Sequence, residues 1–313
     1  VSRKCQGLII KNIFNLPIRE NVIRYADTMN FPIILIEGSD IHYEDLIILI
    51  NERVKHYESL HYRESKVDEM IRNAANNEVV ERIAYEINPS FKSDIISMYF
   101  EAVDDFSAEK YPEMEEKIIG KGILTASDSM FYYKDGFYIV LTRDMFSTIN
   151  EMELVEPILK TFGDSLKNFK VGISPVHHLL YQLKNSLEES RYASRLKGLS
   201  DKEVMLYDEL GLYKIILPFC ENEILTEFAR TYIKPLEDYD LETNGNLLET
   251  AIAYVLNDGD LQKTAEVMIQ HKNTIRYRLK NISNILGIDV FEIKHYETLS
   301  CAVRIYICND NIL

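Results

Sequence analysis

Three short helical segments follow one another between residues 247 and 287, and their spacing constrains the fold more than any other feature of the chain. In the first segment, LLETAIAYVLNDG, four apolar residues fall on one helical face: Leu248, Ile252, Val255 and Leu256. Gly259 stands where a left-handed residue ends such a helix, and Asp260 is suited to cap the next one. That second helix, LQKTAEVMI, is only nine residues long. The pattern predicts an all-α domain in which helices cross closely.

The third segment combines an apolar stripe with a basic face. Asn273 or Thr274 is expected to cap this helix, and Gly287 to end it. The stripe consists of residues spaced 4, 3 and 4 apart: Ile275, Leu279, Ile282 and Leu286. At about 100° per residue, the other faces carry Asn273, Tyr277, Lys280 and Asn284, with Arg276 beside them and Lys272 and Arg278 on the flanks. One side of the helix therefore suits a core, and the other suits a polyanion.

The positive charge of this segment contrasts with the acidity of the whole chain. The formal net charge is -15, yet residues 261–287 hold five lysines and arginines against Glu266, a net charge of +4 that leaves -19 for the rest. A short helix, a tight turn and a longer basic helix predict a helix-turn-helix, whose second helix enters the major groove of DNA. The charge segregation favours local DNA binding driven by counterion release, while the acidic remainder resists nonspecific adhesion.

The residue types on the third helix assign the candidate DNA contacts. We expect Lys272, Asn273, Thr274 and Tyr277 to contact base edges or the groove, because they begin the helix. Arg276, Arg278 and Lys280 are expected mainly to hold phosphates. For a lone basic helix, a solvated surface would be the better interpretation. Here the preceding short helix, the capped turn and the apolar stripe favour DNA.

Length and composition predict a multidomain folded protein. At 313 residues the chain exceeds the roughly 250 to 300 residues that one core serves, and 46% of its residues are hydrophobic. The longest apolar runs, FPIILI and LIILI, fall far short of the roughly 20 residues that span a bilayer. No charged leader followed by an apolar block opens the sequence, so we expect a cytoplasmic protein without a membrane partner.

The chain shows no pattern of a metal, cofactor or catalytic site. Its four cysteines form no CxxC pair, which argues against a zinc cage and a disulfide scaffold, and buried free thiols are favoured. His177 and His178 would point about 100° apart on a helix, so a surface or packing role is favoured over metal binding. No glycine-rich phosphate loop or GxSxG elbow appears. We expect no cofactor, no metal and no enzymatic activity.

The remaining segments predict an α/β block, a connecting helix and an α+β block. Residues 1–55 alternate buried strands (GLIIKN, FPIILIE) with helices, and residues 56–88 form a charged connecting helix that could pair with its copy in a homodimer. Residues 89–235 contain a hairpin around Lys134-Asp135-Gly136, a strand FKVGIS and an amphipathic helix that ends near Gly198. Residues 236–246, LEDYDLETNGN, are the candidate linker before the helical domain at 247–313.

The carboxy-terminal motifs resemble those of the PucR/CdaR family of transcriptional regulators. The resemblance rests on HKNTIRYRLKNISNILGIDV at 271–290, YETLSCAVRIYI at 296–307 and LLETAIAYVLNDGDLQKTAEVM at 247–268. It implies a sequence-specific, homodimeric regulator that binds double-stranded DNA and controls purine or small-carboxylate catabolic genes in response to a small-molecule effector. The chain departs from the family at Ile269 and Gln270, where a small glycine and an aliphatic residue are usual. Because isoleucine is poor at positive φ, we expect a different backbone path in this turn.

The resemblance extends upstream. KVGISPVHHLLYQLKNSLEESRYASRL and YDELGLYKIIL are similar to the family's degenerate nucleotidyl-cyclase-like (GGDEF-like) domain, and residues 1–55 resemble the later half of its amino-terminal PucR sensor domain. A cyclase needs glycines and carboxylates at its hairpin, whereas this one reads YYKDGFY, so catalysis is not expected. The alternative is an inactive cyclase-like signalling or protein-interaction module, whose basic helix docks an acidic partner.

Overall fold

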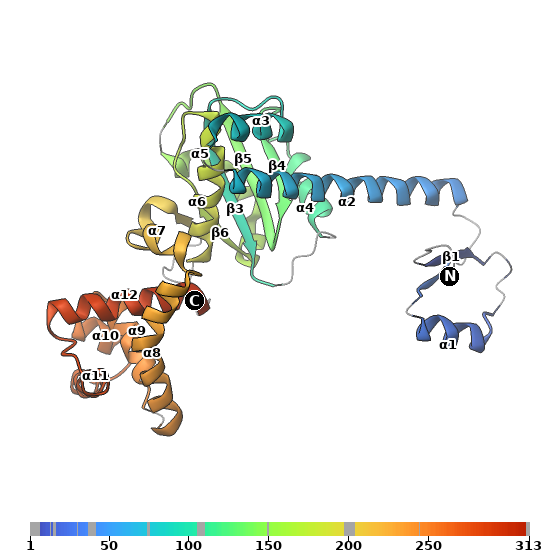
Figure 1. Cartoon of the computed structure of the whole chain (residues 1–313). Coiled ribbons are helices and arrows are strands. Elements are labelled where there is room, and N and C mark those ends of the chain that lie inside the picture. The colour runs from blue at the N-terminus through green and yellow to red at the C-terminus, as the bar shows by residue number, and fades with distance from the viewer. Residues whose placement is uncertain are drawn as a thin grey trace. The chain divides into compact units, whose positions relative to one another are not determined.

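The computed structural model describes residues 7–12, 14, 17–29, 31–36, 42–73, 76–104, 110–148, 150–196, 204–243 and 245–310, and its elements are labelled in Figure 1. The chain divides into two compact units, residues 1–61 and residues 62–313. Within the described ranges, every helix is too short or too polar to cross a bilayer.

The first unit is a strand–helix–strand fragment. It contains β1 (Leu8–Lys11), α1 (Glu20–Thr28), β2 (Ile33–Ile36) and the start of α2 (Tyr43–Arg72). β1 and β2 pair in parallel, from Leu8 opposite Ile33 to Lys11 opposite Ile36. A parallel pair joined by a helix is the βαβ connection that the alternating apolar pattern predicts. The α/β order expected for this block is therefore present.

The expected single helix over residues 56–88 is wrong, because two helices occupy this region. α2 begins at Tyr43, so the last helix of the α/β block and the connecting segment form one continuous helix. α3 (Asn77–Ile87) then starts anew after Asn76, whose side chain accepts a hydrogen bond from the backbone N–H of Val79 at 3.3 Å. Asparagine is a preferred residue at a helix N-cap, and this capping explains the break.

A five-stranded sheet forms the centre of the second unit (Figure 1). Its strands are β3 (Asp94–Ala102), β4 (Ser129–Tyr133), β5 (Gly136–Arg143), β6 (Phe169–Ile173) and β7 (Val204–Leu206). They lie in the order β4-β5-β3-β6-β7, and only the β6–β7 pair is parallel. The helices between them are α4 (Tyr111–Ile119), α5 (Glu151–Phe162) and α6 (Leu183–Arg195), with 3-10 turns at Gly163–Asn168 and Leu180–Gln182. This mixed arrangement agrees with the α+β fold expected for the middle block.

Both faces of the sheet are covered. On one face, Tyr99 and Tyr138 share a core with residues of α3 and with Leu183 and Leu187 of α6. On the other face, Phe100 stacks on Phe162 of α5 with ring centroids 4.6 Å apart. Tyr111 of α4 lies 6.2 Å from the ring of Phe137 on this same side. Successive residues of a strand point to opposite faces of a sheet. Tyr99 and Tyr138 therefore lie on one face, and their neighbours Phe100 and Phe137 lie on the other.

The β4–β5 hairpin confirms the turn predicted at Lys134-Asp135-Gly136. Tyr133 pairs with Gly136, so Lys134 and Asp135 form the two-residue loop, in which Lys134 has a φ of 51°. A Cβ atom at Gly136 would lie 1.9 Å from the carbonyl oxygen of Phe100. Glycine is therefore required where β5 begins against β3.

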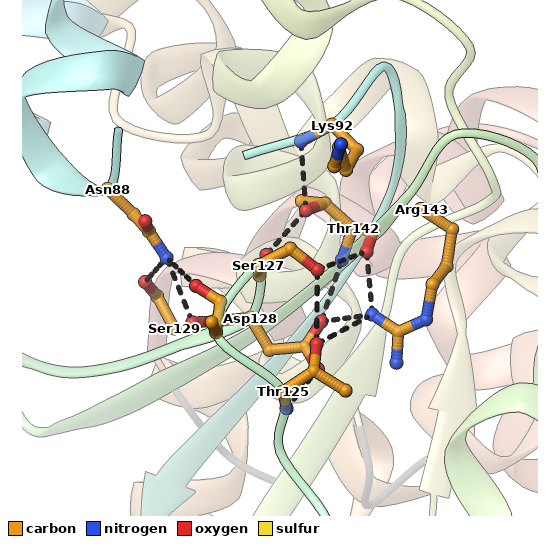
Figure 2. A network of polar contacts seen from close by, with 9 residues as sticks. Asn88, Lys92, Thr125, Ser127, Asp128, Ser129, Thr142 and Arg143 are labelled. Atoms are coloured by element: carbon orange, nitrogen blue, oxygen red, sulfur yellow. Dashed lines mark hydrogen bonds and ion pairs between the residues drawn. The ribbon is translucent and has the colours of Figure 1, made fainter. Parts of the chain in front are cut away.

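A buried polar network joins the end of β5 to the loop before β4 (Figure 2). The carboxylate of Asp128, whose side chain is fully buried, accepts hydrogen bonds from the backbone N–H groups of Thr125 (2.8 Å) and Thr142 (3.0 Å) and forms an ion pair with Arg143. Nearby, the side-chain amide of Asn88 donates to the carbonyl oxygens of Ala126 and Asp128. Because the buried charge is fully satisfied, the network holds the rim of the sheet in one arrangement.

Replacement of Asp128 by alanine is expected to lower the free energy of unfolding by about 3 kcal/mol, because it leaves Arg143 and two backbone donors without their acceptor. The matched control is Asp144→Ala, which removes an exposed ion pair with Lys92 and should cost less than about 0.5 kcal/mol. Urea denaturation measures both changes. Equal losses in the two variants would contradict the role assigned to the network.

The segment after β7 connects the sheet to the carboxy-terminal helices of the same unit. After β7 come the 3-10 turn Tyr207–Leu210, the short helix α7 (Tyr213–Ile216), the 3-10 turn Leu217–Phe219 and α8 (Glu223–Thr243). An apolar cluster contains Leu196, Ile216 and Ala229 together with Ile305 and Cys308 of α12 (Ile293–Asp310). This shared core packs α12 against the end of α6, against α7 and against α8.

The linker expected at residues 236–246 is wrong for most of its length, because α8 continues to Thr243. Leu236 is fully buried, and Lys234 forms an ion pair with Asp238 one helical turn later at 2.8 Å. Asp238 and Glu242 of this stretch thus lie on the exposed face of a helix whose inner face is packed. A polar sequence after Pro235 was not sufficient evidence for a linker.

Candidate nucleic-acid interface

The carboxy-terminal helices pack around one apolar core. α9 (Leu247–Leu256), α10 (Leu261–Val267), α11 (Lys272–Leu286) and α12 follow α8, and Figure 1 draws them in orange and red. The buried residues of this core come from all five helices and the loop before α12: Ile233, Leu236, Leu247, Ala251, Tyr254, Val255, Ala265, Ile275, Leu279, Ile282, Val290, Leu299, Val303 and Ile307. The compact all-α unit predicted from the periodicity is present.

The start of α9 is held by a residue from the supposed linker. The carboxylate of Asp240 accepts hydrogen bonds from the backbone N–H groups of Leu247 (2.8 Å) and Leu248 (2.9 Å). The first N–H groups of a helix lack partners within the helix, so a carboxylate at this point stabilises it. No local pattern predicts this contact, because Asp240 lies in another helix, α8.

The turn between α9 and α10 agrees closely with the prediction. Gly259 has a φ of 76° and donates its N–H to the carbonyl oxygen of Tyr254, but Asp258, with a φ of 54°, is the first left-handed residue. The carboxylate of Asp260 accepts the N–H groups of Gln262 and Lys263 at 2.7 and 3.1 Å. These hydrogen bonds, first from Lys263 and then from Gln262, lower the pKa of Asp260. Asp260 is therefore the N-cap of α10.

The turn between α10 and α11 corrects the expectation for Ile269. Ile269 adopts a left-handed φ of 52°, so the turn keeps the backbone path that a glycine would favour. The N–H of Ile269 donates to Glu266 at 3.1 Å, and the N–H of Gln270 donates to Ala265 at 2.9 Å. These two bonds close α10 as a Schellman motif. The side chain of Ile269 is 89% exposed, which limits the cost of the conformation to local strain.

α11 begins earlier than predicted. Its N-cap is His271, whose Nδ1 accepts a hydrogen bond from the N–H of Asn273 at 3.2 Å, so neither Asn273 nor Thr274 caps the helix. Gly287 ends the helix with a φ of 66°, as predicted. Ile275, Leu279 and Ile282 of the predicted stripe are fully buried, and Leu286 packs against the same core.

Most of the candidate DNA-contacting side chains lie on the exposed side of α11. Lys272, Asn273, Arg276, Tyr277 and Lys280 are exposed, and Thr274 is half-buried. Tyr277 is 65% exposed although it is a large aromatic residue. Among the described residues, no carboxylate forms an ion pair with Arg276 or Lys280. The basic side of the helix is therefore open, and the charges of Arg276 and Lys280 are not taken up by ion pairs within the described residues.

Arg278 differs from the other candidates. It was expected on a flank of the helix, where it would hold a phosphate, but it is half-buried and its Nη1 donates to Thr250 Oγ1 of α9 at 3.3 Å. Thr250 is fully buried and donates in turn to the carbonyl oxygen of Asn246 at 2.6 Å. Arg278 thus links α11 to α9 within the domain.

The part of the chain that the structure describes contains no group of three or more histidine, cysteine or acidic side chains placed to hold a metal ion. The interpretation of the histidine pair assumed that both residues lie on a helix. His177 instead forms an isolated β-bridge with Ile95. Its Nε2 lies 2.7 Å from the carboxylate of Glu189, and its side chain is largely buried.

Burial raises the pKa of the Cys308 thiol to about 12, which keeps this cysteine protonated at neutral pH.

Comparison with known proteins identifies the carboxy-terminal helices. Residues 247–305 match the family described as the PucR C-terminal helix-turn-helix domain. These residues form a PucR-type helix-turn-helix domain. α10 and α11 are the two helices of the motif, and the exposed basic side of α11 belongs to its second helix.

Two curated relatives from Bacillus subtilis (strain 168) are similar over part of the chain. The proline-responsive transcriptional activator PutR is 26% identical over 127 residues, which cover 40% of this chain and 31% of PutR. The DNA-binding transcriptional activator AdeR is 26% identical over 104 residues, which cover 33% of this chain and 25% of AdeR. The matched regions thus span about a third or less of these relatives.

Two further similarities are narrower or weaker. An uncharacterized protein of Haemophilus influenzae is 45% identical over 56 residues, which cover 18% of this chain and 15% of that protein. The crystal structure of a regulator of polyketide synthase expression from Bifidobacterium adolescentis aligns with 80% of this chain and 99% of its own, at 16% identity and a TM-score of 0.38. A TM-score of this size does not establish a shared fold.

The replacement Ile269→Gly is expected to stabilise the helix-turn-helix motif by about 1 kcal/mol, because glycine removes the strain of a left-handed β-branched residue. Amide hydrogen exchange of α10 and α11 in the full chain should slow by about fivefold. Gly287→Ala is the opposite control: a Cβ there would meet nothing within 4 Å, so faster exchange would report backbone strain alone. An unchanged or faster rate for Ile269→Gly would show that the turn is not strained.

Proposed function

We propose that this chain is a sequence-specific DNA-binding transcription regulator of the PucR/CdaR type. The observation that carries the proposal is the open basic side of α11, which lies opposite a fully buried stripe in a domain of the PucR helix-turn-helix family. In this motif the second helix lies in the major groove and the first helix crosses the backbone. A gel shift with competitor DNA separates this function from docking of an acidic protein, which would show no preference among DNA sequences.

The proposed roles follow from position along α11. Lys272, Asn273, Thr274 and Tyr277 lie in its first two turns, where side chains reach base edges, and we assign them to base or groove contacts. Arg276 and Lys280 are assigned to phosphates. Arg278 was predicted to hold a phosphate as well. Its hydrogen bond to Thr250 favours a positioning role, in which it sets the angle of α11 against α9.

A homodimer is part of the proposal. One helix-turn-helix covers too few base pairs for specificity, and two copies about 34 Å apart would occupy successive major grooves on one side of the duplex. The block at residues 89–235 and the segment at residues 56–88 are the proposed dimer surfaces. In support, α2 is a helix of 30 residues, and such a length can present a long face to a second copy.

The amino-terminal and middle blocks are proposed to sense and transmit. Residues 1–55 are assigned to a partial PucR-type sensor domain, and residues 89–235 to a degenerate GGDEF-like domain without catalysis. The hairpin supports the second assignment, because Lys134 occupies its turn and only Asp135 supplies a carboxylate there. One relative is named as proline-responsive. We propose a cytoplasmic regulator of purine or small-carboxylate catabolic genes that responds to a small-molecule effector.

Arg276→Ala and Lys280→Ala are each expected to weaken binding to duplexes of any sequence, because each removes one phosphate contact. The slope of log K against log salt should become shallower by about 0.9 for every bound copy. Fluorescence anisotropy of a labelled random-sequence duplex measures this slope. Lys160→Ala on α5 changes the net charge equally and should leave the slope unchanged. If all three variants changed it by the same amount, only overall charge would matter.

Asn273→Ala and Tyr277→Ala are expected to alter which sequences the protein prefers, because these residues are assigned to base contacts. Selection of duplexes from a random pool, followed by sequencing, measures the preference. Arg276→Ala serves as the comparison, since loss of a phosphate contact should lower affinity without changing the selected sequence. A uniform loss of affinity in the Asn273 or Tyr277 variant, with an unchanged selected sequence, would contradict the assignment.

A further inference from the structure

A cavity of about 410 Å³ lies beside the β4–β5 hairpin. Its walls come from α2, the hairpin and α6, and they include Asp68, Arg72, Lys134, Tyr138 and Arg191. Tyr133 and Tyr138 of this wall belong to the face of the sheet that α3 and α6 cover. The volume falls within the roughly 300 to 1,000 Å³ of small-molecule sites.

Two of the three cations of the cavity wall, Lys134 and Arg191, lie over the same tyrosine ring. The guanidinium carbon of Arg191 lies 5.8 Å from the ring centroid of Tyr133, and the Nζ of Lys134 lies 5.2 Å from the same centroid. Neither side chain forms an ion pair within the described ranges. The positive charges of Lys134 and Arg191 therefore lie close to the same aromatic ring.

The carboxylates of Asp68 and Asp135 attract the Lys134 ammonium, and that of Glu101 attracts the Arg191 guanidinium, but among the described residues none of them forms an ion pair with either cation. Burial raises the pKa of Tyr99 and Tyr133, and raises that of Tyr138 well above its ordinary value, so the hydroxyls near Arg191 stay neutral. Burial first, and repulsion by Arg191 second, lower the pKa of the Lys134 amine. The Arg191 guanidinium is half-buried and has lost part of its hydration, and an anion that binds there recovers part of that cost. The Lys134 ammonium is more exposed and can turn toward the same anion.

The carboxylates in the wall are already engaged by other groups. Asp68 accepts a hydrogen bond from the Tyr133 hydroxyl at 2.9 Å, and Glu188 forms an ion pair with Lys184 at 2.8 Å. The backbone N–H of Lys134 donates to Glu64 at 3.1 Å, which anchors the hairpin turn. The two cations are thus held in place while their charges remain directed at the cavity.

We propose that this cavity binds a small organic anion, whose carboxylate or phosphate group is held between Arg191 and Lys134. The planar guanidinium of Arg191 suits two parallel hydrogen bonds to such a group, and the Lys134 ammonium adds a point charge. The rest of the ligand lies against Ile71 and Tyr192, which complete the wall. The site requires no DNA and lies outside the helix-turn-helix domain.

The test is a binding titration of the full chain without DNA, with sodium succinate and with inorganic phosphate as probes. Both are compared with sodium chloride at equal ionic strength, by isothermal titration calorimetry and by the shift in Tm. We expect at least one probe to bind saturably; succinate alone would indicate a carboxylate ligand, and phosphate alone a phosphate ester. Lys134→Gln should weaken that binding by about tenfold or more, as expected for loss of one charge-assisted hydrogen bond.

Lys214→Gln is the matched control. Lys214 also lies over a tyrosine ring, 4.9 Å from the centroid of Tyr207, but it already has a carboxylate partner in Asp208. This variant should bind the probe like the unaltered protein. The proposal is overturned if neither probe binds saturably, or if Lys134→Gln binds as tightly as Lys214→Gln. Because no DNA is present, such a failure would leave the proposed DNA interface unaffected.

Discussion

The burial of one side of α11 is the interaction on which the carboxy-terminal domain depends. Ile275, Leu279 and Ile282 are fully buried in the core that α8, α9, α10 and α12 share, and burial of such side chains contributes about 1.5 to 3 kcal/mol each. Packing these three residues against the core fixes how α11 is rotated about its axis. The same rotation determines which side chains point away from the core. Arg276, Tyr277 and Lys280 are exposed for that reason, and not because of any local signal of their own. The apolar stripe thus positions the surface that, in our proposal, contacts DNA.

The periodic features could be predicted from the sequence because they depend on local physics. The apolar spacing of α11, the capping of α10 by Asp260 and the hairpin at Lys134 follow from the residues themselves. Features that depend on distant partners could not be predicted. Asp240 caps α9 from the end of α8, and Thr250 draws Arg278 inward from α9. Ile269 takes a left-handed conformation because the hydrogen bonds that close α10 outweigh its local preference. Tertiary contacts thus decided the first two cases, whereas in the third the hydrogen bonds at the end of α10 decided the backbone conformation.

The continuation of α8 through residues 236–243 bears on how a signal could reach the helix-turn-helix domain. A flexible linker would leave the domain free to move, whereas α8 contributes Leu236 to the carboxy-terminal core and Ala229 to the cluster that holds α7. α12 takes part in the same two clusters through Val303 and Ile305. Two helices therefore enter both cores, and a displacement of α7 or the end of α6 would be felt at the base of the helical domain. Coupling through packed helices would need no contact between the proposed effector and α11.

Charge distribution connects the two proposed sites. In a chain with a net charge of -15, lysines and arginines would readily find carboxylates, and many do so here, as in the pairs Lys66–Glu86 and Arg143–Asp128. A cation left without a partner on this acidic background can therefore accept an external anion without breaking an existing ion pair. Arg276 and Lys280 meet this condition on an open helix face, where a long polyanion has access. Lys134 and Arg191 meet it at the wall of a cavity of about 410 Å³, whose size admits only a small one. Both sites present two cations without ion-pair partners among the described residues. The shape of the surface around the cations, more than their charge, therefore decides whether a duplex or a small anion can bind.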